Sequence, residues 1–285
     1  MSSKSSFTVG IDVGGTFTDL LAIDPETREV KLAKVPTTVD NQAIGFMAAL
    51  ASASLDPAVL QAVVHGTTTT TNALLERKIS KVGLITTQGF RDVLELGRRT
   101  RPQPYGLRGT FRPMIDREVR LEVPERMDAD GKVLTPLDEA AVAEAAKKLM
   151  AQGCEAVVIH FLHSYINPAH ERRAAEIVRG LWPNAYVTAG HVILSEYREY
   201  ERGVTAAVNA SVQPVLDRYL SRLRKELGAK GFDRDLLVMQ GNGGTISSQL
   251  IAEAAVNTVM SGPASGVMAA AYTGRASGHP NLITY

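Results

Sequence analysis

This 285-residue chain carries 31 Lys and Arg against 30 Asp and Glu, so its formal net charge is +1. The balance excludes the charge excess typical of a nucleic-acid or membrane-surface binder, and we expect neither partner. No apolar run is long enough to cross a membrane, and the one cysteine, Cys154, excludes an internal disulfide. We expect a cytoplasmic α/β protein in which Cys154 is buried and Arg98, Arg99 and Arg101 lie on a solvated loop.

The chain begins with a pattern typical of an antiparallel meander. Residues 7–11 alternate between apolar and polar side chains, and a turn that contains Gly14 and Gly15 joins them to a second strand-like run at 17–23. A second turn signal precedes a third strand over 29–35. A dinucleotide-binding domain would need a helix directly after its first glycine turn, so this order excludes one.

Hydrophobic spacing predicts alternating helices and strands over the rest of the chain. We expect helices at 41–53, 71–77, 90–96, 137–150 (opened by Pro136), 168–181 and 264–272, and a helix at 199–227 that is interrupted near Pro214. We expect strands at 60–64, 82–85, 156–161, 186–188, 236–239 and 282–285. The predicted division is into two domains, 1–195 and 196–285, with a seam near 191–197.

The turn between the first two strands carries an unusual set of polar groups, in the sequence Asp12-Val13-Gly14-Gly15-Thr16-Phe17-Thr18-Asp19. The glycines allow backbone N–H groups to approach an anion closely, and the threonines add hydroxyl donors. Two carboxylates beside a phosphate are favourable only with a divalent cation between them, so we expect Asp12 and Asp19 to bind a metal. The structural alternative is a plain tight hairpin whose glycines provide positive φ angles.

A second polar segment follows the predicted strand 60–64. His65-Gly66 leads into five consecutive threonines, residues 67–71, and then Asn72. Threonine is poor within a helix but good at its start, where free N–H groups favour an anion. A capped helix without a ligand is the alternative, and His65 is either a general base or a histidine that ends a strand.

Together these stretches resemble a known family. The matching segments are VGIDVGGTFTDLLAID, HGTTTTTNALLERK, ITTQGFRDVLELGRR, NPAHERRAAEI, REYERGVTAAVNASVQPVLDRYL, VMQGNGGTISS and SGPASGV. The chain is similar to the N-terminal region of the hydantoinase A/5-oxoprolinase/acetone carboxylase family, within the actin-like ATPase superfamily. The resemblance implies an actin-like (ribonuclease H-like) α/β lobe, with a mixed sheet that begins in the antiparallel meander and helices on both faces.

The resemblance also implies roles for individual residues. Asp12, Thr68 and His65 are candidate catalytic residues, and Asp12 and Asp19 are candidate Mg²⁺ ligands. Nucleotide contacts are expected from Gly14, Gly15, Thr16, Thr18, Gly66, Thr67 and Asn72.

The implied activity is ATP-dependent hydrolysis of a small cyclic amide, in which phosphorylation activates the carbonyl oxygen. A hydantoinase B-type partner subunit or domain is implied, and self-association is a further expectation. A ketone carboxylase subunit of the same family, or a nucleotide-binding module completed by another chain, is the alternative. Relatives carry a second glycine-rich phosphate loop beyond residue 285, so the chain alone is expected to be inactive.

Overall fold

The computed structural model describes residues 6–38, 41–98, 105–106 and 112–284. The chain forms two compact units: residues 1–77 with 215–285 make unit 1, and residues 78–214 make unit 2. Unit 1 is therefore built from both ends of the chain. The division into domains 1–195 and 196–285 remains a prediction about how the chain is organised.

Unit 1 contains a six-stranded mixed sheet in the order β12-β11-β4-β1-β2-β3. The antiparallel meander predicted from the sequence is confirmed, because β2 pairs antiparallel with both β1 and β3. Strand β4 joins β1 in parallel, and β11 joins β4 in parallel. The strands are β1 (Thr8–Val13), β2 (Phe17–Ile23), β3 (Val30–Pro36), β4 (Ala62–Thr67), β11 (Leu236–Met239) and β12 (Thr245–Ser247).

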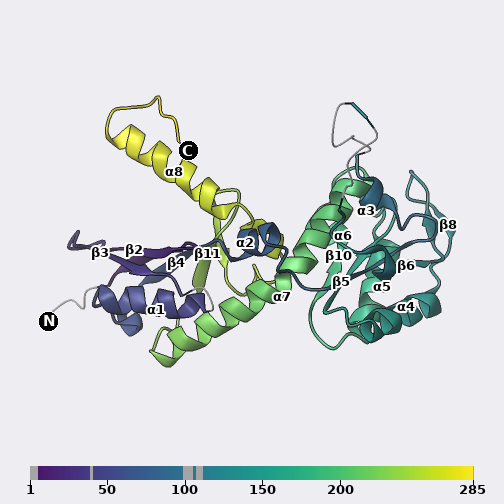
Figure 1. The fold of residues 1–285 in the computed structure, drawn as a ribbon, viewed down its shortest axis with the longest axis horizontal. Coiled ribbons are helices and arrows are strands. Elements are labelled where there is room, and N and C mark those ends of the chain that lie inside the picture. The colour runs from purple at the N-terminus through teal and green to yellow at the C-terminus, as the bar shows by residue number, and fades with distance from the viewer. Residues whose placement is uncertain (1–5, 39–40, 99–104, 107–111, 285) are drawn as a thin grey trace. The chain divides into compact units, whose positions relative to one another are not determined.

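The two faces of this sheet carry different helices (Figure 1). Strand alternation directs Ile11 and His65 toward α1 (Gln42–Ser52), where Phe46 contacts His65 edge to face at 5.3 Å. The opposite face lies toward α8 (Ser261–Ala276), which contacts β4 and β11. Helices on both faces confirm the predicted architecture. Val267 and Met268 of α8 are more than half exposed.

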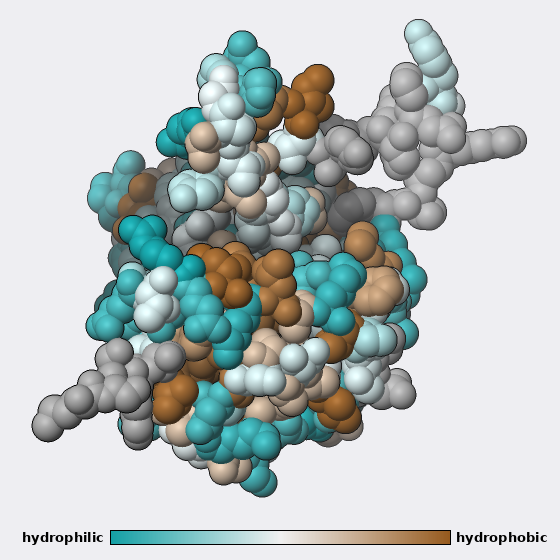
Figure 2. All heavy atoms as spheres, turned by 90° about the vertical axis from the view of Figure 1, so that its left-hand side faces the viewer, coloured by the Kyte–Doolittle hydropathy of each residue, from teal (hydrophilic) through white to brown (hydrophobic). Residues whose placement is uncertain are grey.

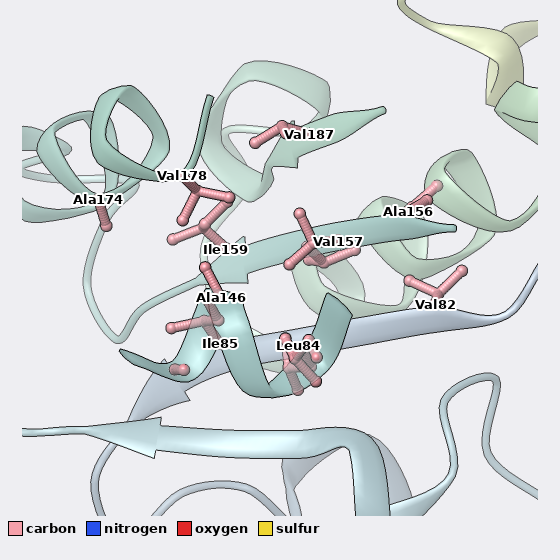
Figure 3. Close-up of a cluster of buried hydrophobic side chains, with 14 of the residues drawn as sticks. Val82, Leu84, Ile85, Ala146, Ala156, Val157, Ile159, Ala174, Val178 and Val187 are labelled. Atoms are coloured by element: carbon pink, nitrogen blue, oxygen red, sulfur yellow. The ribbon is translucent and has the colours of Figure 1, made fainter. Parts of the chain in front are cut away.

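Unit 2 has a parallel four-stranded sheet in the order β10-β9-β5-β6. Its central strands β5 (Val82–Thr87) and β9 (Ala156–His160) are buried along their whole length, as expected for a covered parallel sheet. Helices α4 (Glu139–Ala151) and α5 (Ala169–Arg179) pack small and branched side chains against the sheet (Figure 3). The remaining strands are β6 (Arg120–Val123) and β10 (Val187–Ala189), with β7 (Arg126–Met127) and β8 (Val133–Thr135) forming a separate pair.

Short helices complete the described chain. They are α2 (Thr69–Leu75), α3 (Val93–Leu96) and α6 (Gly190–Ile193), with 3₁₀ turns at Pro57–Val59, Arg117–Val119 and Ala255–Thr258. None of the helices in the described ranges has the length and apolar character that crossing a membrane requires. Cys154 is buried, as predicted, and burial raises the pKa of its thiol. Arg98 is exposed and pairs with Glu201 at 2.7 Å, whereas Arg99 and Arg101 lie outside the described residues.

Three expectations about secondary structure were wrong. Helix α7 (Glu199–Ala229) continues through Pro214, because its buried apolar residues hold the turns on both sides of the proline in place. Helix α4 is capped by Asp138, which accepts from Ala141 N–H, so Pro136 lies before the helix. Residues 281–284 form no strand. Here His279 N–H bonds Gly274 O at 2.8 Å and Leu282 contacts Gly274, so the chain folds back on α8.

Candidate phosphate and metal site

Four residues on four neighbouring strands form a row across the sheet of unit 1. Asp12 on β1 pairs in register with Gly66 on β4 and with Asp19 on β2, and Asp19 pairs with Lys34 on β3. Register partners project from the same face of a sheet. The strand pairing therefore brings together Asp12, Asp19 and Gly66, which were predicted from separate motifs, and adds Lys34.

This row lies in a cavity of about 760 Å³ within unit 1. One wall is the sheet face and the other is the small-residue side of α8, at Gly262, Ser265, Gly266 and Ala269. Part of the floor is apolar, because Leu21 and Leu32 line the cavity and remain exposed. Figure 2, seen from the left-hand side of Figure 1, shows hydrophobic side chains among hydrophilic ones. The cavity thus combines one charged row with an apolar surface.

The two carboxylates have different electrostatic surroundings. Lys34 Nζ donates to both oxygens of Asp19, at 2.8 and 3.1 Å. At Asp12, burial of the carboxyl by surrounding protein atoms raises its pKa, and the neighbouring Asp19 charge raises it further. The Asp12 residue as a whole is exposed. Its carboxyl group at the cavity floor, however, is partly surrounded by protein atoms, and this local burial raises the pKa. A cation at Asp12 would offset both the burial of the charged carboxylate and its repulsion by Asp19.

Because Gly66 has no side chain, the Asp12 carboxylate can lie directly beside it. A Cβ atom at position 66 would lie 2.7 Å from Asp12 Oδ1, closer than such atoms approach. The position needs glycine for this close contact and not for its backbone angle, because Gly66 is not among the glycines with positive φ. Any side chain here would displace the carboxylate.

The glycine loop lies at the end of β1 and β2 and does not line the cavity. Neither Gly14 nor Gly15 has a positive φ angle, so the structural alternative of a glycine-requiring hairpin does not account for them. Gly14 N–H donates to Phe17 O at 3.0 Å, which closes the turn, whereas a Cβ at Gly15 would meet no atom within 4 Å. The Thr16 side chain is exposed on this open loop.

Thr18 faces the other side of the sheet, contrary to its assignment as a loop hydroxyl. Its side chain is fully buried and its hydroxyl is hydrogen-bonded to that of Thr37 at 3.0 Å. The cause is strand alternation, since Thr18 is already part of β2 and its neighbour Asp19 takes the cavity face. Thr18 therefore packs the base of the loop.

The threonine run spans the end of β4 and the first residues of α2, which begins at Thr69, two residues before the predicted start. Only part of the run lies beside the loop. Thr68 Oγ1 donates to Val13 O at 3.4 Å, and Asn72 Nδ2 donates to Thr68 Oγ1 at 3.2 Å. Thr68 thus connects the loop to the first turn of α2. Thr67 is buried, with its hydroxyl 2.8 Å from that of Thr69, so its side chain does not reach the cavity.

His65 is a packing residue in this structure. Its Nδ1 lies 3.2 Å from Ile11 O, its Nε2 lies 2.8 Å from Tyr219 Oη, and its side chain is fully buried. Burial lowers the pKa of His65 to about 4. Alternation along β4 places His65 on the face opposite Gly66, and both ring nitrogens are engaged, so we no longer assign it a catalytic role.

Lys34 is the cavity residue that sequence reasoning missed. Its partner Asp19 is 15 residues away, and only the β2–β3 register brings them together. A lysine two residues before Pro36 on an alternating strand was the available signal. Within the described ranges, no group of three or more His, Cys, Asp or Glu forms a metal site, so the carboxylate pair is the candidate ligand set.

Residues 8–181 match the hydantoinase/oxoprolinase N-terminal region, and residues 202–285 match hydantoinase/oxoprolinase. The chain belongs to the hydantoinase/oxoprolinase family. Caprolactamase subunit alpha of Pseudomonas jessenii is 36% identical over 296 residues, which cover 99% of this chain and 42% of that protein. Acetophenone carboxylase gamma subunit of Aromatoleum aromaticum is 33% identical over 300 residues, covering 97% of this chain and 40% of that protein.

Solved structures of this family have the same fold. A nucleotide-free structure of acetone carboxylase matches with a TM-score of 0.84 and 30% identity, covering 96% of this chain and 41% of that one. The ATP-dependent caprolactamase from Pseudomonas jessenii matches with a TM-score of 0.84 and 34% identity, covering 95% and 41%. This hydantoinase/oxoprolinase chain therefore spans about two fifths of the length of these relatives.

Proposed function

We propose that unit 1 binds the phosphate groups of ATP through a divalent cation held by Asp12 and Asp19. The observation that carries this proposal is the in-register carboxylate pair at the floor of a large cavity, with Asp12 lacking the charge compensation that Lys34 gives Asp19. The names of two matched relatives, an ATP-dependent caprolactamase and an enzyme of ATP-dependent acetone carboxylation, support the use of ATP.

The residues fit a magnesium ion. Mg²⁺ prefers oxygen ligands and is usually bound by one or two carboxylates together with substrate phosphates. Gly66 leaves the Asp12 carboxylate room at the cavity floor. When bound, the ion would neutralise phosphate charge and orient the transferring phosphoryl group. Asp12 and Asp19 would hold the ion, while Gly15 and Thr16 on the open loop would approach the phosphates.

In the complete protein, we propose, this site drives hydrolysis of a small cyclic amide. An amide carbonyl is a poor electrophile, so uncatalysed hydrolysis is slow. Transfer of the γ-phosphoryl group to the carbonyl oxygen, with release of ADP, makes that oxygen a leaving group. Water then attacks the carbon, and the ring C–N bond opens to give a free amine and an acyl phosphate. A second water hydrolyses the acyl phosphate to the carboxylate and inorganic phosphate. The part of this chain would be to bind and orient the phosphates, chiefly through Asp12, Asp19 and the loop beside Thr68.

The same chemistry permits a second function. A ketone oxygen phosphorylated as its enol would be activated for carboxylation, and the 33% identity to an acetophenone carboxylase subunit favours this alternative equally. Several relatives are named as subunits, which supports a hydantoinase B-type partner for this chain and allows self-association. A cytoplasmic location is consistent with such an enzyme and is part of this proposal.

Two measurements test the proposal. Calorimetry of the purified chain with MgATP should show binding that disappears without the divalent cation. ATP consumption by the full-length protein with its partner, measured over cyclic amides and ketones, should identify the substrate class. ATP consumption that depends on the amide and needs no bicarbonate supports hydrolysis. ATP consumption that depends on both a ketone and bicarbonate supports carboxylation. Absence of metal-dependent nucleotide binding would refute the site itself.

A further inference from the structure

Lys34 is placed where the proposed metal and the proposed phosphates would meet. It projects from β3 into the same cavity as Asp12 and Asp19, and its ammonium group contacts both carboxylate oxygens of Asp19. The row Asp12–Asp19–Lys34 then carries two negative charges and one positive charge. Lys34 therefore compensates the charge of one of the two carboxylates, that of Asp19.

The contact between Lys34 and Asp19 is easily exchanged. The side chains of Lys34 and Asp19 are 58% and 54% exposed, and exposed ion pairs hold their partners weakly. The ammonium group also lies over the Phe17 ring, 4.9 Å from its centroid. The lysine therefore contacts both the Asp19 carboxylate and the Phe17 ring of β2. The backbone register that positions Lys34 does not depend on the ion pair.

The divalent ion and the Lys34 ammonium group would compete for Asp19, and their chemistry predicts which of them binds it. A divalent ion bound between two carboxylates is attracted electrostatically by both, whereas the lysine is paired with Asp19 alone. A lysine ammonium is a compact charge on a flexible stem with three donors, and it binds phosphate as a point charge. Displacement of Lys34 by the metal would therefore leave the lysine free beside the metal-bound phosphates.

We infer that Lys34 exchanges partners during nucleotide binding: it neutralises Asp19 without metal and donates to a phosphate oxygen when the metal takes both carboxylates. This inference rests on the proposed function and makes Lys34 a direct nucleotide contact.

The test compares two affinities in the full chain. Mn²⁺ alone is titrated by electron paramagnetic resonance, and MgATP is titrated by calorimetry. Lys34→Met should bind Mn²⁺ about threefold more tightly, because no ammonium competes for Asp19. It should bind MgATP about tenfold more weakly, because a charged donor to phosphate is lost. Lys34→Arg, which retains the charge, should remain near the wild type in nucleotide affinity.

Lys31→Met is the matched control. Lys31 also lies on β3, pairs with Glu29 at 4.0 Å and covers the Phe7 ring at 4.9 Å, but it does not line the cavity. It should change neither affinity. Unfolding temperatures of all three variants show whether the fold is retained.

Opposite shifts in the two affinities support the exchange, since a merely structural lysine would weaken both. Any result for folded Lys34→Met in which the two affinities do not move in opposite directions overturns it. If the wild type binds MgATP but Lys34→Met equals it, the exchange alone fails. If the wild type binds no MgATP, the proposed function fails and the exchange falls with it.

Discussion

Gly66 and Asp12 are register partners on the parallel strands β4 and β1, and a Cβ atom at position 66 would lie 2.7 Å from Asp12 Oδ1. This contact brings together residues of two motifs that are far apart in the sequence. It also makes position 66 a direct probe of the Asp12 carboxylate.

Gly66→Ala should displace the Asp12 carboxylate and impair nucleotide use. We expect a loss of ATP turnover of about 10²-fold in the full-length protein, because a displacement of roughly 1 Å in a reacting geometry costs that much. Gly10→Ala is the control on the same face, since a Cβ there meets Leu21 O at an ordinary 3.9 Å. Equal turnover in the two variants would show that the Asp12 position is unimportant.

Asp12→Asn should stabilise the fold while it abolishes metal-dependent nucleotide binding. The folded pKa of Asp12 lies above the ordinary value of 3.8, so ionisation costs stability at a pH above the folded pKa. Below pH 3.8 the carboxyl is protonated in both states and the cost vanishes. The variant should therefore unfold at a higher temperature than the wild type at pH 7, and the difference should close as the pH falls toward 3.8.

Thermal unfolding followed by circular dichroism between pH 3.5 and 7, ~0.5 pH units apart, measures this difference. A variant less stable than the wild type at pH 7 would show that Asp12 is stabilised by a partner in the folded chain. Retained MgATP affinity in the same variant would remove Asp12 from the proposed metal site.

His65 should make unit 1 sensitive to acid. Its folded pKa of about 4 lies below the ordinary 6.5, so the unfolded chain binds the extra proton between these values. Stability is fully present above about pH 6.5 and falls as the pH drops toward 4, with a slope of about 1.4 kcal/mol per pH unit for one group. His65→Gln should reduce that slope while it lowers stability at neutral pH through the loss of contacts with Tyr219 and Phe46.

Urea unfolding at several pH values measures how the free energy of unfolding depends on pH in the wild type and in His65→Gln. His160 in unit 2, whose pKa burial also lowers to about 4, remains in both proteins and supplies an unchanged background. A His65 ring that titrates near 6.5 by NMR in the folded chain would contradict the burial argument.

The sequence was informative where a local pattern determines structure. Alternation and turn residues predicted the meander, and the threonines predicted a helix after β4 whose start was placed two residues late. The errors about site residues arose where the face of a strand or long-range register decides the outcome. Thr18 and His65 have polar side chains suited to a binding site, but they project from the sheet face opposite the cavity. Alternation within β2 and β4 could have revealed this. The partner of Lys34 could not be predicted, because the pairing with Asp19 depends on the register of β3.

The threonine run offers a way to separate binding from folding within one short segment. Thr68 joins the glycine loop to α2, since its hydroxyl donates to Val13 O and accepts from Asn72. Thr70 is buried on the other side, where its hydroxyl lies 2.8 Å from that of Thr258. Thr258 donates its own proton to Ala255 O, so Thr70 is the donor in this pair.

Thr68→Val should therefore weaken MgATP binding by about fivefold, the equivalent of one hydrogen bond of roughly 1 kcal/mol, with a smaller effect on unfolding. Thr70→Val should lower the free energy of unfolding by about 1 kcal/mol and leave MgATP affinity unchanged. Thr68→Ser, which keeps the hydroxyl, should bind nucleotide like the wild type. Calorimetry and urea unfolding of the three variants measure both quantities. If Thr68→Val loses only stability and Thr70→Val loses affinity, the side of the run that faces the nucleotide has been assigned wrongly.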